Sequence, residues 1–285
     1  MKFSTYFSTL PFTILFALGI LPSSVSAQKA FTRQEINDSI QELPYFSNHL
    51  DNYFMSGVPT NRTINHNSAN AKYQISFKQI LSKESLPYDT YLMLTYTQKA
   101  FWNVFENSLP FRDLNFHPTI SLGKFVFKKN DELAGIATLS FEHESNGRDS
   151  IFSRSWNRLS LGYTTNVFKN TTASFKAWLP FAYKEGNPDL LDYVGIAEIK
   201  VSHELIHDKL SFAVMARKGL KFKYGNLRSR VYFNPFKRNI ANQYIMLEWY
   251  LGQAESLLDY QKSQSMIRVG YVIKSNEFNW FRGKN

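Results

Sequence analysis

A histidine and a serine two positions apart, followed by an asparagine further along the chain, have the types and spacing that acyl-transfer chemistry needs. His143 and Ser145 would share one face of a β-strand, because side chains alternate between its two faces. A serine hydroxyl becomes a nucleophile when a neighbouring imidazole takes its proton, and the amide of Asn157 on an adjacent strand could orient that imidazole. A neutral amide stabilises the developing imidazolium less than a carboxylate does, so a bound cation is the natural additional charge. The spacing alone permits a serine hydrolase site, but a structural histidine at a polar rim is the commoner arrangement and remains the alternative.

Two stretches of alternating residues are expected to position these side chains. The first runs from Leu133 to Ser145, and one face of it comprises Leu133, Gly135, Ala137, Leu139, Phe141, His143 and Ser145. The opposite face includes Ser140, Glu142 and Glu144. In the next stretch Asn157 shares a face with Leu159, Leu161 and Tyr163. Polar groups that interrupt an apolar face are costly in lipid, so their presence there indicates a function.

Similar alternation recurs along the chain from Tyr73 onward. It is clear in residues 73–78, 174–184, 210–217 and 267–274. The segments are about ten residues long and number about twelve, and a closed bacterial barrel has an even number of strands of this length. Closure also satisfies every backbone hydrogen bond in lipid. We therefore predict an all-β fold, a transmembrane antiparallel β-barrel of about twelve strands, with polar faces that line a wet lumen.

The composition agrees with a barrel and excludes a helical membrane protein. Aromatic residues make up 16% of the chain, yet the mean hydropathy is −0.32. After residue 27 the chain lacks the run of about 18 apolar residues that a membrane-spanning helix needs. In a barrel only alternate residues face lipid, and aromatic residues form girdles at both interfaces.

The N-terminus has the layout of a secretory signal peptide. One lysine and a mostly apolar stretch at residues 10–21 precede the small residues Val25, Ser26 and Ala27. We expect cleavage before Gln28, which assigns residues 1–27 to the signal peptide. A retained membrane anchor is the alternative, although the apolar stretch is shorter than the roughly 20 residues of a spanning helix.

The remaining residues, 28–285, are expected to form a single barrel domain. Residues from about 28 to 70 are polar and lack sustained periodicity, which predicts an extended N-terminal segment. The signal peptide holds one lysine and no acidic residue, so its removal lowers the net charge from +10 to +9. This charge suits an anionic membrane surface, and no nucleic-acid partner is expected for an exported protein. The absence of cysteine means that the fold holds together without disulfides.

Two motifs and several shorter landmarks resemble one known family. The motifs are residues 143–148 and residues 153–158. The landmarks, in the family's order, are residues 96–99, 110–112, 187–189, 255–260 and 268–270. The chain resembles the outer membrane phospholipase A family over nearly all of the sequence that follows the signal peptide.

The resemblance implies a twelve-stranded barrel of the bacterial outer membrane that hydrolyses the acyl esters of phospholipids. The family acts at either acyl position, and lysophospholipase activity is implied as well. Carried over by motif position, His143 is the general base, Ser145 the nucleophile and Asn157 the orienting residue. The family works as a calcium-dependent homodimer.

The resemblance also implies a calcium site that two subunits share. Its ligands would be the main-chain carbonyl of Arg148, the hydroxyl of Ser153 and a serine of the second subunit, which corresponds to Ser108. Such hard oxygen donors are what calcium prefers. The chain departs from the family in the order of Asp149 and Ser150, in a shorter loop before Pro110, and in the extension at residues 279–285. None of these departures removes a catalytic atom.

Gln98 is expected at the interface of the homodimer. It shares a face with Leu92, Leu94, Tyr96, Ala100 and Trp102. A glutamine that faces lipid is costly without a partner, and a symmetric interface supplies the same glutamine from the second subunit. A position at the level of the lipid headgroups is the alternative.

Two other classes of protein remain as alternatives to a membrane acyl hydrolase. One is a non-catalytic outer-membrane porin-like barrel, in which the polar rim is structural. The other is a soluble all-β binding protein. The intact set of His143, Ser145 and Asn157 favours the enzyme over the porin. The signal peptide, the wet lumen face and the length of the chain argue against the soluble protein.

Overall fold

The structure is a computed structural model that describes residues 31–84, 86–236 and 242–275. The predicted signal peptide and the extension at residues 279–285 lie outside the described residues. The strands are β1 (Phe46–Asn48), β2 (Asn52–Pro59), β3 (Asn70–Ile80), β4 (Thr90–Trp102), β5 (Phe111–Phe127), β6 (Leu133–Ser145), β7 (Ser155–Phe168), β8 (Thr171–Phe181), β9 (Ala197–Ile206), β10 (Leu210–Lys218), β11 (Gly225–Phe233), β12 (Gln243–Gly252) and β13 (Gln264–Ile273). The helices are α2 (Arg33–Glu42), the 3-10 turn η1 (Ser150–Phe152) and α3 (Leu190–Val194).

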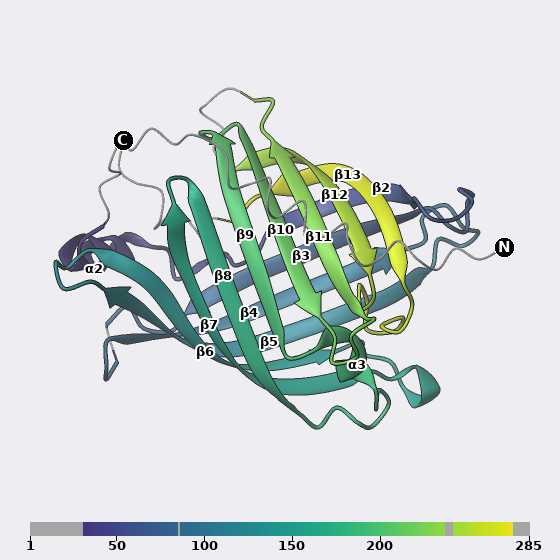
Figure 1. Cartoon of the computed structure of the whole chain (residues 1–285), viewed down its shortest axis with the longest axis horizontal. Helices are drawn as coiled ribbons and strands as arrows, with labels where there is room; N and C mark the ends of the chain where they lie inside the picture. Colours follow the sequence, from purple (N-terminus) through teal and green to yellow (C-terminus); the bar gives the residue numbers. More distant parts are fainter. Residues whose placement is uncertain (1–30, 85, 237–241, 276–285) are drawn as a thin grey trace.

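Twelve antiparallel strands, β2 to β13, form a closed barrel (Figure 1). Each strand pairs with the next along the chain, and β13 pairs with β2, with Ile267 opposite Val58, which closes the ring. The short β1 pairs with β3 beyond the end of β2. The predicted antiparallel barrel of about twelve strands is therefore confirmed. Neither helix in the described part of the chain has the length and apolarity to span a membrane.

The two faces of each strand differ sharply in composition. On β6, Leu139 and Phe141 are 44% and 47% exposed on the outer face, whereas the residues that follow each of them, Ser140 and Glu142, are buried. Successive side chains of a strand point to opposite faces, so this alternation follows directly from the sequence. An outer band of exposed apolar side chains is typical of a barrel that lies in lipid.

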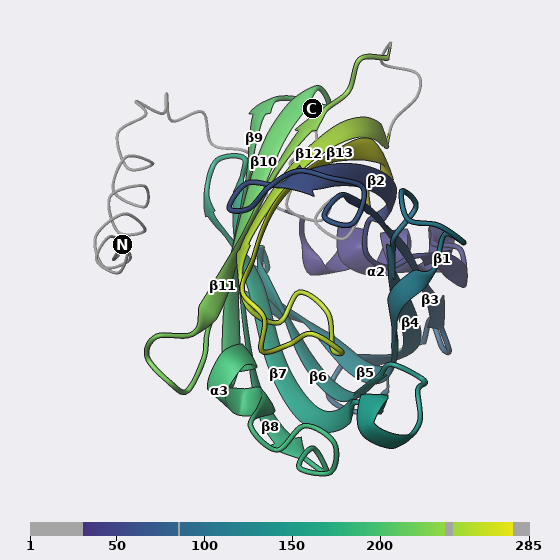
Figure 2. The ribbon, with the colours of Figure 1, turned by 90° about the vertical axis from the view of Figure 1, so that its right-hand side faces the viewer.

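The interior around β3, β12 and β13 is filled by side chains, whereas the sequence predicted a wet lumen. Elsewhere the inward side chains of Lys176 and Arg217 remain 26% and 24% exposed. Lys72 Nζ lies 2.7 Å from Glu248 and 3.0 Å from Glu255, and Arg268 lies 2.6 Å from Glu255. Beside these ion pairs lies a buried cluster of Tyr53, Met55, Ala213, Tyr232, Tyr244, Met246 and Val272. A barrel of this size is narrower than a porin of 16–18 strands, so long side chains meet across it. The segment between β12 and β13 also folds into the opening, as Figure 2 shows.

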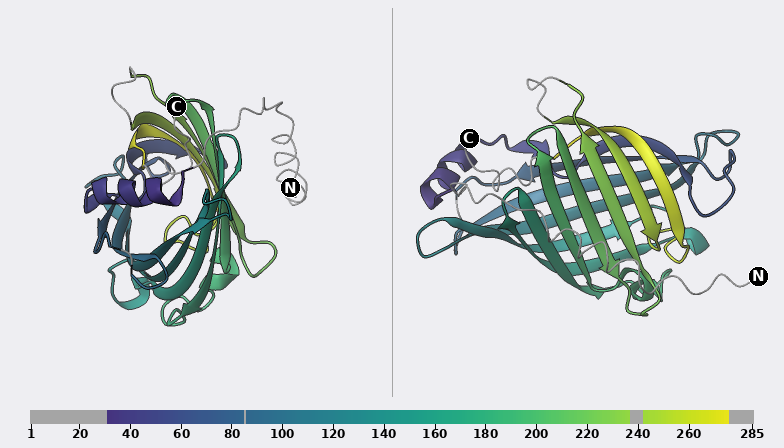
Figure 3. Two further views of the ribbon diagram at one scale, coloured as in Figure 1. Left: turned by 90° about the vertical axis from the view of Figure 1, so that its left-hand side faces the viewer. Right: turned by 45° about the horizontal axis from the view of Figure 1, so that its top comes forward.

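The N-terminal part of the described chain differs from the predicted extended segment. Thr32 and Glu35 form a capping box that starts α2, and Ile36 and Ile40 are the buried residues of that helix. Figure 3 shows α2 at the end of the barrel opposite to α3. The next segment supplies β2, a strand of the barrel. Both elements are short and bury few apolar side chains, so their periodicity in the sequence is weak.

Leu133 is a second difference, because it does not lie on the outer face. The pairing of β5 with β6 shifts by one residue between Gly135 and Leu133, since Val126 pairs with Gly135 and Phe127 pairs with Leu133. Such an irregularity moves the following side chain to the other face. Leu133 is accordingly only 6% exposed and packs with the isoleucines of α2. The outer face of β6 therefore begins at Gly135.

Candidate active site

The register between β6 and β7 places two of the predicted site residues directly opposite each other. His143 pairs with Asn157, and the ring Nδ1 lies 2.8 Å from the amide Oδ1. An amide oxygen only accepts, so the Nδ1–H of His143 donates to it and leaves Nε2 as the nitrogen that can take a proton. Both side chains are half-buried. The ring is therefore fixed in one orientation on the outer wall of the barrel.

Ser145 lies on the same face of β6, two residues beyond His143. It pairs with Ser155 of β7 on one side and with Phe116 of β5 on the other. Within the described residues no hydrogen bond joins the Ser145 hydroxyl to the ring of His143. Hydrogen bonds of this kind often tighten only when a substrate is bound. The serine hydroxyl and the imidazole are therefore adjacent on the strand, and Asn157 holds the imidazole through Nδ1.

The row of residues next to His143 and Asn157 is entirely apolar. Its members pair with one another across five neighbouring strands, and each is at least 42% exposed. They are Leu94, Ile120, Phe141, Leu159 and Leu179. The site therefore lies where polar groups meet the apolar outer band. An ester group can reach the serine there while its acyl chains remain in contact with apolar side chains.

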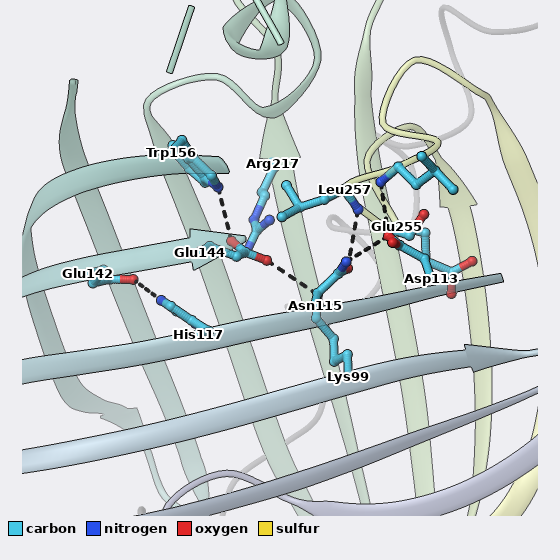
Figure 4. A network of polar contacts seen from close by, with 12 residues as sticks. Lys99, Asp113, Asn115, His117, Glu142, Glu144, Trp156, Arg217, Glu255 and Leu257 are labelled. Carbon is cyan, nitrogen blue, oxygen red and sulfur yellow. Dashed lines mark hydrogen bonds and ion pairs between the residues drawn. The ribbon is translucent and has the colours of Figure 1, made fainter. Parts of the chain in front are cut away.

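Behind the site, the inner faces of the same strands carry a dense network of charges. Glu142 lies 2.9 Å from both Arg158 Nε and His117 Nε2. Glu144 accepts from Arg158 at 3.1 Å and from Trp156 at 3.2 Å. Figure 4 shows both glutamates pointing into the barrel. These contacts join β5, β6 and β7, so the strands that carry the predicted triad are fixed relative to one another.

Asn146 shapes the loop that follows Ser145, and the sequence alone did not reveal this role. Its Nδ2 donates to the carbonyl of Phe152 at 2.9 Å and to Asp113 at 3.4 Å, and its Oδ1 accepts from the backbone N–H of Arg154 at 2.9 Å. The side chain is only 3% exposed. One amide thus ties both ends of the loop together. An Asn-Gly pair directly after a strand is a turn signal that could have pointed to it.

The structure places the predicted calcium ligands in two exposed loops. Arg148 and Ser153 lie in the loop between β6 and β7, where the backbone N–H of Arg148 also donates to Asn146 Oδ1 at 3.4 Å. Ser108 lies in the exposed turn between β4 and β5 with a φ of +64°. Within the described part of this chain no hydrogen bond connects Ser108 to Arg148 or Ser153. A carbonyl and two hydroxyl oxygens are hard donors, so the residues present fit calcium.

A chain of contacts links the loop between β6 and β7 to the segment between β12 and β13, which folds into the barrel. The Arg148 guanidinium donates to the carbonyl of Arg112 at 2.8 Å. The Arg112 guanidinium in turn donates to both carboxylate oxygens of Asp259, at 2.8 and 2.7 Å. Burial raises the pKa of Asp259, but the hydrogen bonds and positive charges of Arg112 and Lys262 together hold that pKa below its usual range. The loop is therefore held in place by Arg112 and Asp259 as well as by Asn146.

Gln98 lies on the outer face of β4, in the same row as Ser145. It pairs with Phe116, which pairs with Ser145, and on its other side it pairs with Ile75. The Tyr96 hydroxyl donates to Gln98 Oε1 at 3.1 Å. The glutamine thus has one partner within its own chain, and its position on the outer face is as expected.

A barrel with a candidate acyl-hydrolase site on its outer wall is the class of protein that this fold and geometry define. A family model described as Phospholipase A1 matches residues 29–273. The phospholipase A1 of Escherichia coli (strain K12) is 30% identical over 213 residues, which cover 71% of this chain and 68% of that protein. The phospholipase A1 of Salmonella typhimurium is 29% identical over 257 residues, which cover 84% of each. The chain belongs to the phospholipase A1 family.

Solved structures show the same fold. The outer membrane phospholipase A of Escherichia coli aligns with a TM-score of 0.72 and 23% identity, over 84% of this chain and 98% of that one. The outer membrane phospholipase of Salmonella typhi, a dimer with bound calcium, aligns with a TM-score of 0.74 and 24% identity, over 84% and 97%. The architecture of this barrel is therefore that of the outer membrane phospholipases.

Proposed function

We propose that this protein is an exported outer-membrane phospholipase that hydrolyses the acyl esters of phospholipids at either acyl position, and of lysophospholipids. One observation carries the proposal. His143 is oriented by Asn157 at 2.8 Å on the outer face, adjacent to Ser145 and next to the row of exposed apolar residues. A water-soluble hydrolase would instead need a pocket that admits its substrate from water.

Each of the three residues has a separate role in the proposed reaction. The Ser145 hydroxyl attacks the ester carbonyl while His143 Nε2 takes its proton. The imidazolium then gives that proton to the departing alcohol, which leaves an acyl group on Ser145. Water, deprotonated by the same imidazole, releases the fatty acid and restores the serine. Asn157 accepts the hydrogen bond from Nδ1 throughout and so holds Nε2 toward the serine.

Calcium and a second subunit complete the proposed site. The carbonyl of Arg148 and the hydroxyl of Ser153 would hold the ion together with Ser108 of the partner subunit. A calcium ion there would supply positive charge for the oxyanion, which offsets the weaker stabilisation of the imidazolium by the neutral Asn157. Asn146 and Arg112 fix the loop, so it need not be ordered when the ion binds. Because the site spans two subunits, calcium and dimerisation favour each other by the same free energy.

The filled interior argues against a porin-like barrel. Lys72, Glu248 and Arg268 are each at most 1% exposed, and they bridge the lumen with Glu255. A pore needs an open path lined by solvated side chains. An arrangement that fills the lumen and places polar groups on the outer wall suits an enzyme whose substrate is a lipid.

Covalent labelling tests the nucleophile. A long-chain sulfonyl fluoride should modify Ser145, and the reaction should be faster with calcium present. Mass spectrometry of the digested protein identifies the modified residue, and Ser145→Ala is the control. Labelling that persists in Ser145→Ala, or that is absent from the parent protein, would falsify the assignment.

A further inference from the structure

The loop between β10 and β11 exposes an alternation of lysines and large apolar side chains. Its lysines are Lys218, Lys221 and Lys223, and all three are exposed. Between them lie Leu220, 57% exposed, and Phe222, 89% exposed. Large apolar side chains that face water so fully are costly, so their exposure indicates that something covers them in the working protein.

The backbone of this loop is held firmly against α3. The N–H of Leu220 donates to the carbonyl of Leu191 at 3.0 Å, and the rings of Tyr224 and Tyr193 stack at 4.3 Å. At Gly219 the approach is so close that a Cβ would lie 2.0 Å from the carbonyl oxygen of Asp192. The loop therefore presents Phe222 in a fixed position, since its backbone is anchored on both sides of that residue.

The loop also continues the apolar outer band of the barrel. Below it, Ala216 of β10 pairs with Leu227 of β11 on the outer face, and Val231 further along is 42% exposed. The loop lies at the end of the barrel that carries the candidate active site, because β10 and β6 both run toward that end. The side chains at its tip thus lie where the apolar band gives way to the headgroup region.

We infer that residues 218–224 dock on the phosphate-bearing headgroups of an anionic lipid surface at the level of the active site. Leu220 and Phe222 enter the apolar boundary, and the lysines pair with phosphate groups. Lys218 Nζ lies 4.3 Å from the centre of the Phe222 ring, a cation–π contact, and donates to the carbonyl of Tyr224 at 3.1 Å, so this lysine keeps a positive charge directly beside the apolar side chain. Lys221 contacts Asp192 at 2.7 Å, but its side chain remains 61% exposed and can still face a phosphate.

The inference rests on the proposed location in a membrane, and lipid is chosen over a protein partner for two reasons. The apolar side chains are continuous with the lipid-facing band, which a protein partner would not need to match. The charged side chains within residues 218–224 are all positive, which suits a surface of repeated phosphates better than a mixed protein surface.

A labelled cysteine can test this docking, because the chain contains no native cysteine. Phe222→Cys carries an environment-sensitive fluorophore, and the protein is folded into vesicles of phosphatidylcholine alone or of phosphatidylcholine with phosphatidylglycerol. We expect a blue-shifted emission and less quenching by acrylamide in the anionic vesicles. Adding Lys221→Gln and Lys223→Gln should lower the ratio of lipid-embedded to water-exposed label by roughly 30-fold, since each lysine near an anionic surface contributes about fivefold.

A matched pair of lysines at the other end of the barrel provides the control. Lys128→Gln with Lys129→Gln removes two exposed charges from the turn between β5 and β6 and should leave the emission unchanged. Inorganic phosphate added to phosphatidylcholine vesicles should not reproduce the blue shift, and a shift with phosphate alone would overturn docking on a lipid surface. Equal emission in both vesicle types also overturns it, and points to a protein partner. A barrel that inserts in neither vesicle contradicts the proposed function itself.

Discussion

The outer and inner faces of β6 and β7 differ far more than their common backbone suggests. On the inner face a single side chain, that of Arg158, contacts Glu142, Glu144 and His117, and it is 4% exposed. On the outer face, one residue along the same strands, His143 has one hydrogen-bond partner among the residues that the structure describes, Asn157. The strands are therefore stabilised by contacts inside the barrel. The few polar residues on the outer face are not needed for stability and can serve the reaction. Substitutions on the two faces should therefore separate activity from stability.

The largest expected effect is on the outer face and concerns activity alone. His143→Ala should lower kcat by at least about 100-fold and by up to about 10⁴-fold, because a general base is lost. Asn157→Ala should lower it severalfold to about 100-fold, since an orienting group adjusts the base rather than replaces it. Release of fatty acid from micellar phospholipid measures both, and the urea midpoint of unfolding should stay close to that of the parent. Equal losses in the two variants would contradict a purely orienting role for Asn157.

The inner face should show the opposite behaviour, a loss of stability. Arg158→Leu leaves Glu142 and Glu144 buried with fewer partners, and breaking such buried pairs costs about 3–5 kcal/mol. Ser160→Ala is the matched control, because Ser160 faces the same interior and its buried hydroxyl has no hydrogen-bond partner among the described residues. Its free energy of unfolding should change by no more than about 1 kcal/mol. Urea unfolding in vesicles measures both, and a stable Arg158→Leu barrel would show that the network is not the scaffold.

The sequence predicted the outer face of the barrel better than its inner face. A period of two residues is local, so it shows which side chains share a face, including His143, Ser145 and Asn157. The partners of an inward charge come from strands far apart in sequence. Lys72 and Glu248, for example, meet only because the ring closes. The sequence therefore showed polar inner faces, which predicted a wet lumen, but not the ion pairs that pack part of the interior.

Irregular features were missed for a related reason. The shift that turns Leu133 inward leaves no mark in the alternation of its own strand, because it arises from the pairing with Phe127. The role of Asn146 depends on a loop whose ends return to it, which spacing alone does not reveal. Helix α2 did carry a local signal, the capping box of Thr32 and Glu35, but it precedes only two buried residues.

A smaller effect is expected at Asn146, which directly follows the last residue of β6. Asn146→Ala removes the hydrogen bonds to Phe152 and Arg154, so the loop between β6 and β7 must be ordered when the proposed calcium ion binds. Loss of buried hydrogen bonds of this kind costs about 1–3 kcal/mol, and we expect about a tenfold rise in the calcium concentration for half-maximal activity. Activity at saturating calcium should change little, and Asn130→Ala in a distant exposed turn serves as control. A fall in the saturated rate with unchanged calcium dependence would place the role of Asn146 elsewhere.

The smallest expected effect concerns the proposed contact of the outer face with a second copy of the chain. Gln98 lies in the same row as Ser145, and the Tyr96 hydroxyl already donates to its Oε1 at 3.1 Å. A hydrogen bond between transmembrane segments contributes on average only about 0.6 kcal/mol, and the partner within the chain keeps the loss small. Gln98→Ala should therefore raise the dissociation constant of the dimer by about threefold. Sedimentation in detergent, with calcium and a bound acyl inhibitor, measures this, and Tyr96→Phe tests whether the intrachain bond competes with the one across the interface. Loss of the dimer in Gln98→Ala would show that Gln98 contributes more than one hydrogen bond. A parent protein that stays monomeric yet hydrolyses lipid at full rate would contradict a calcium site shared between subunits.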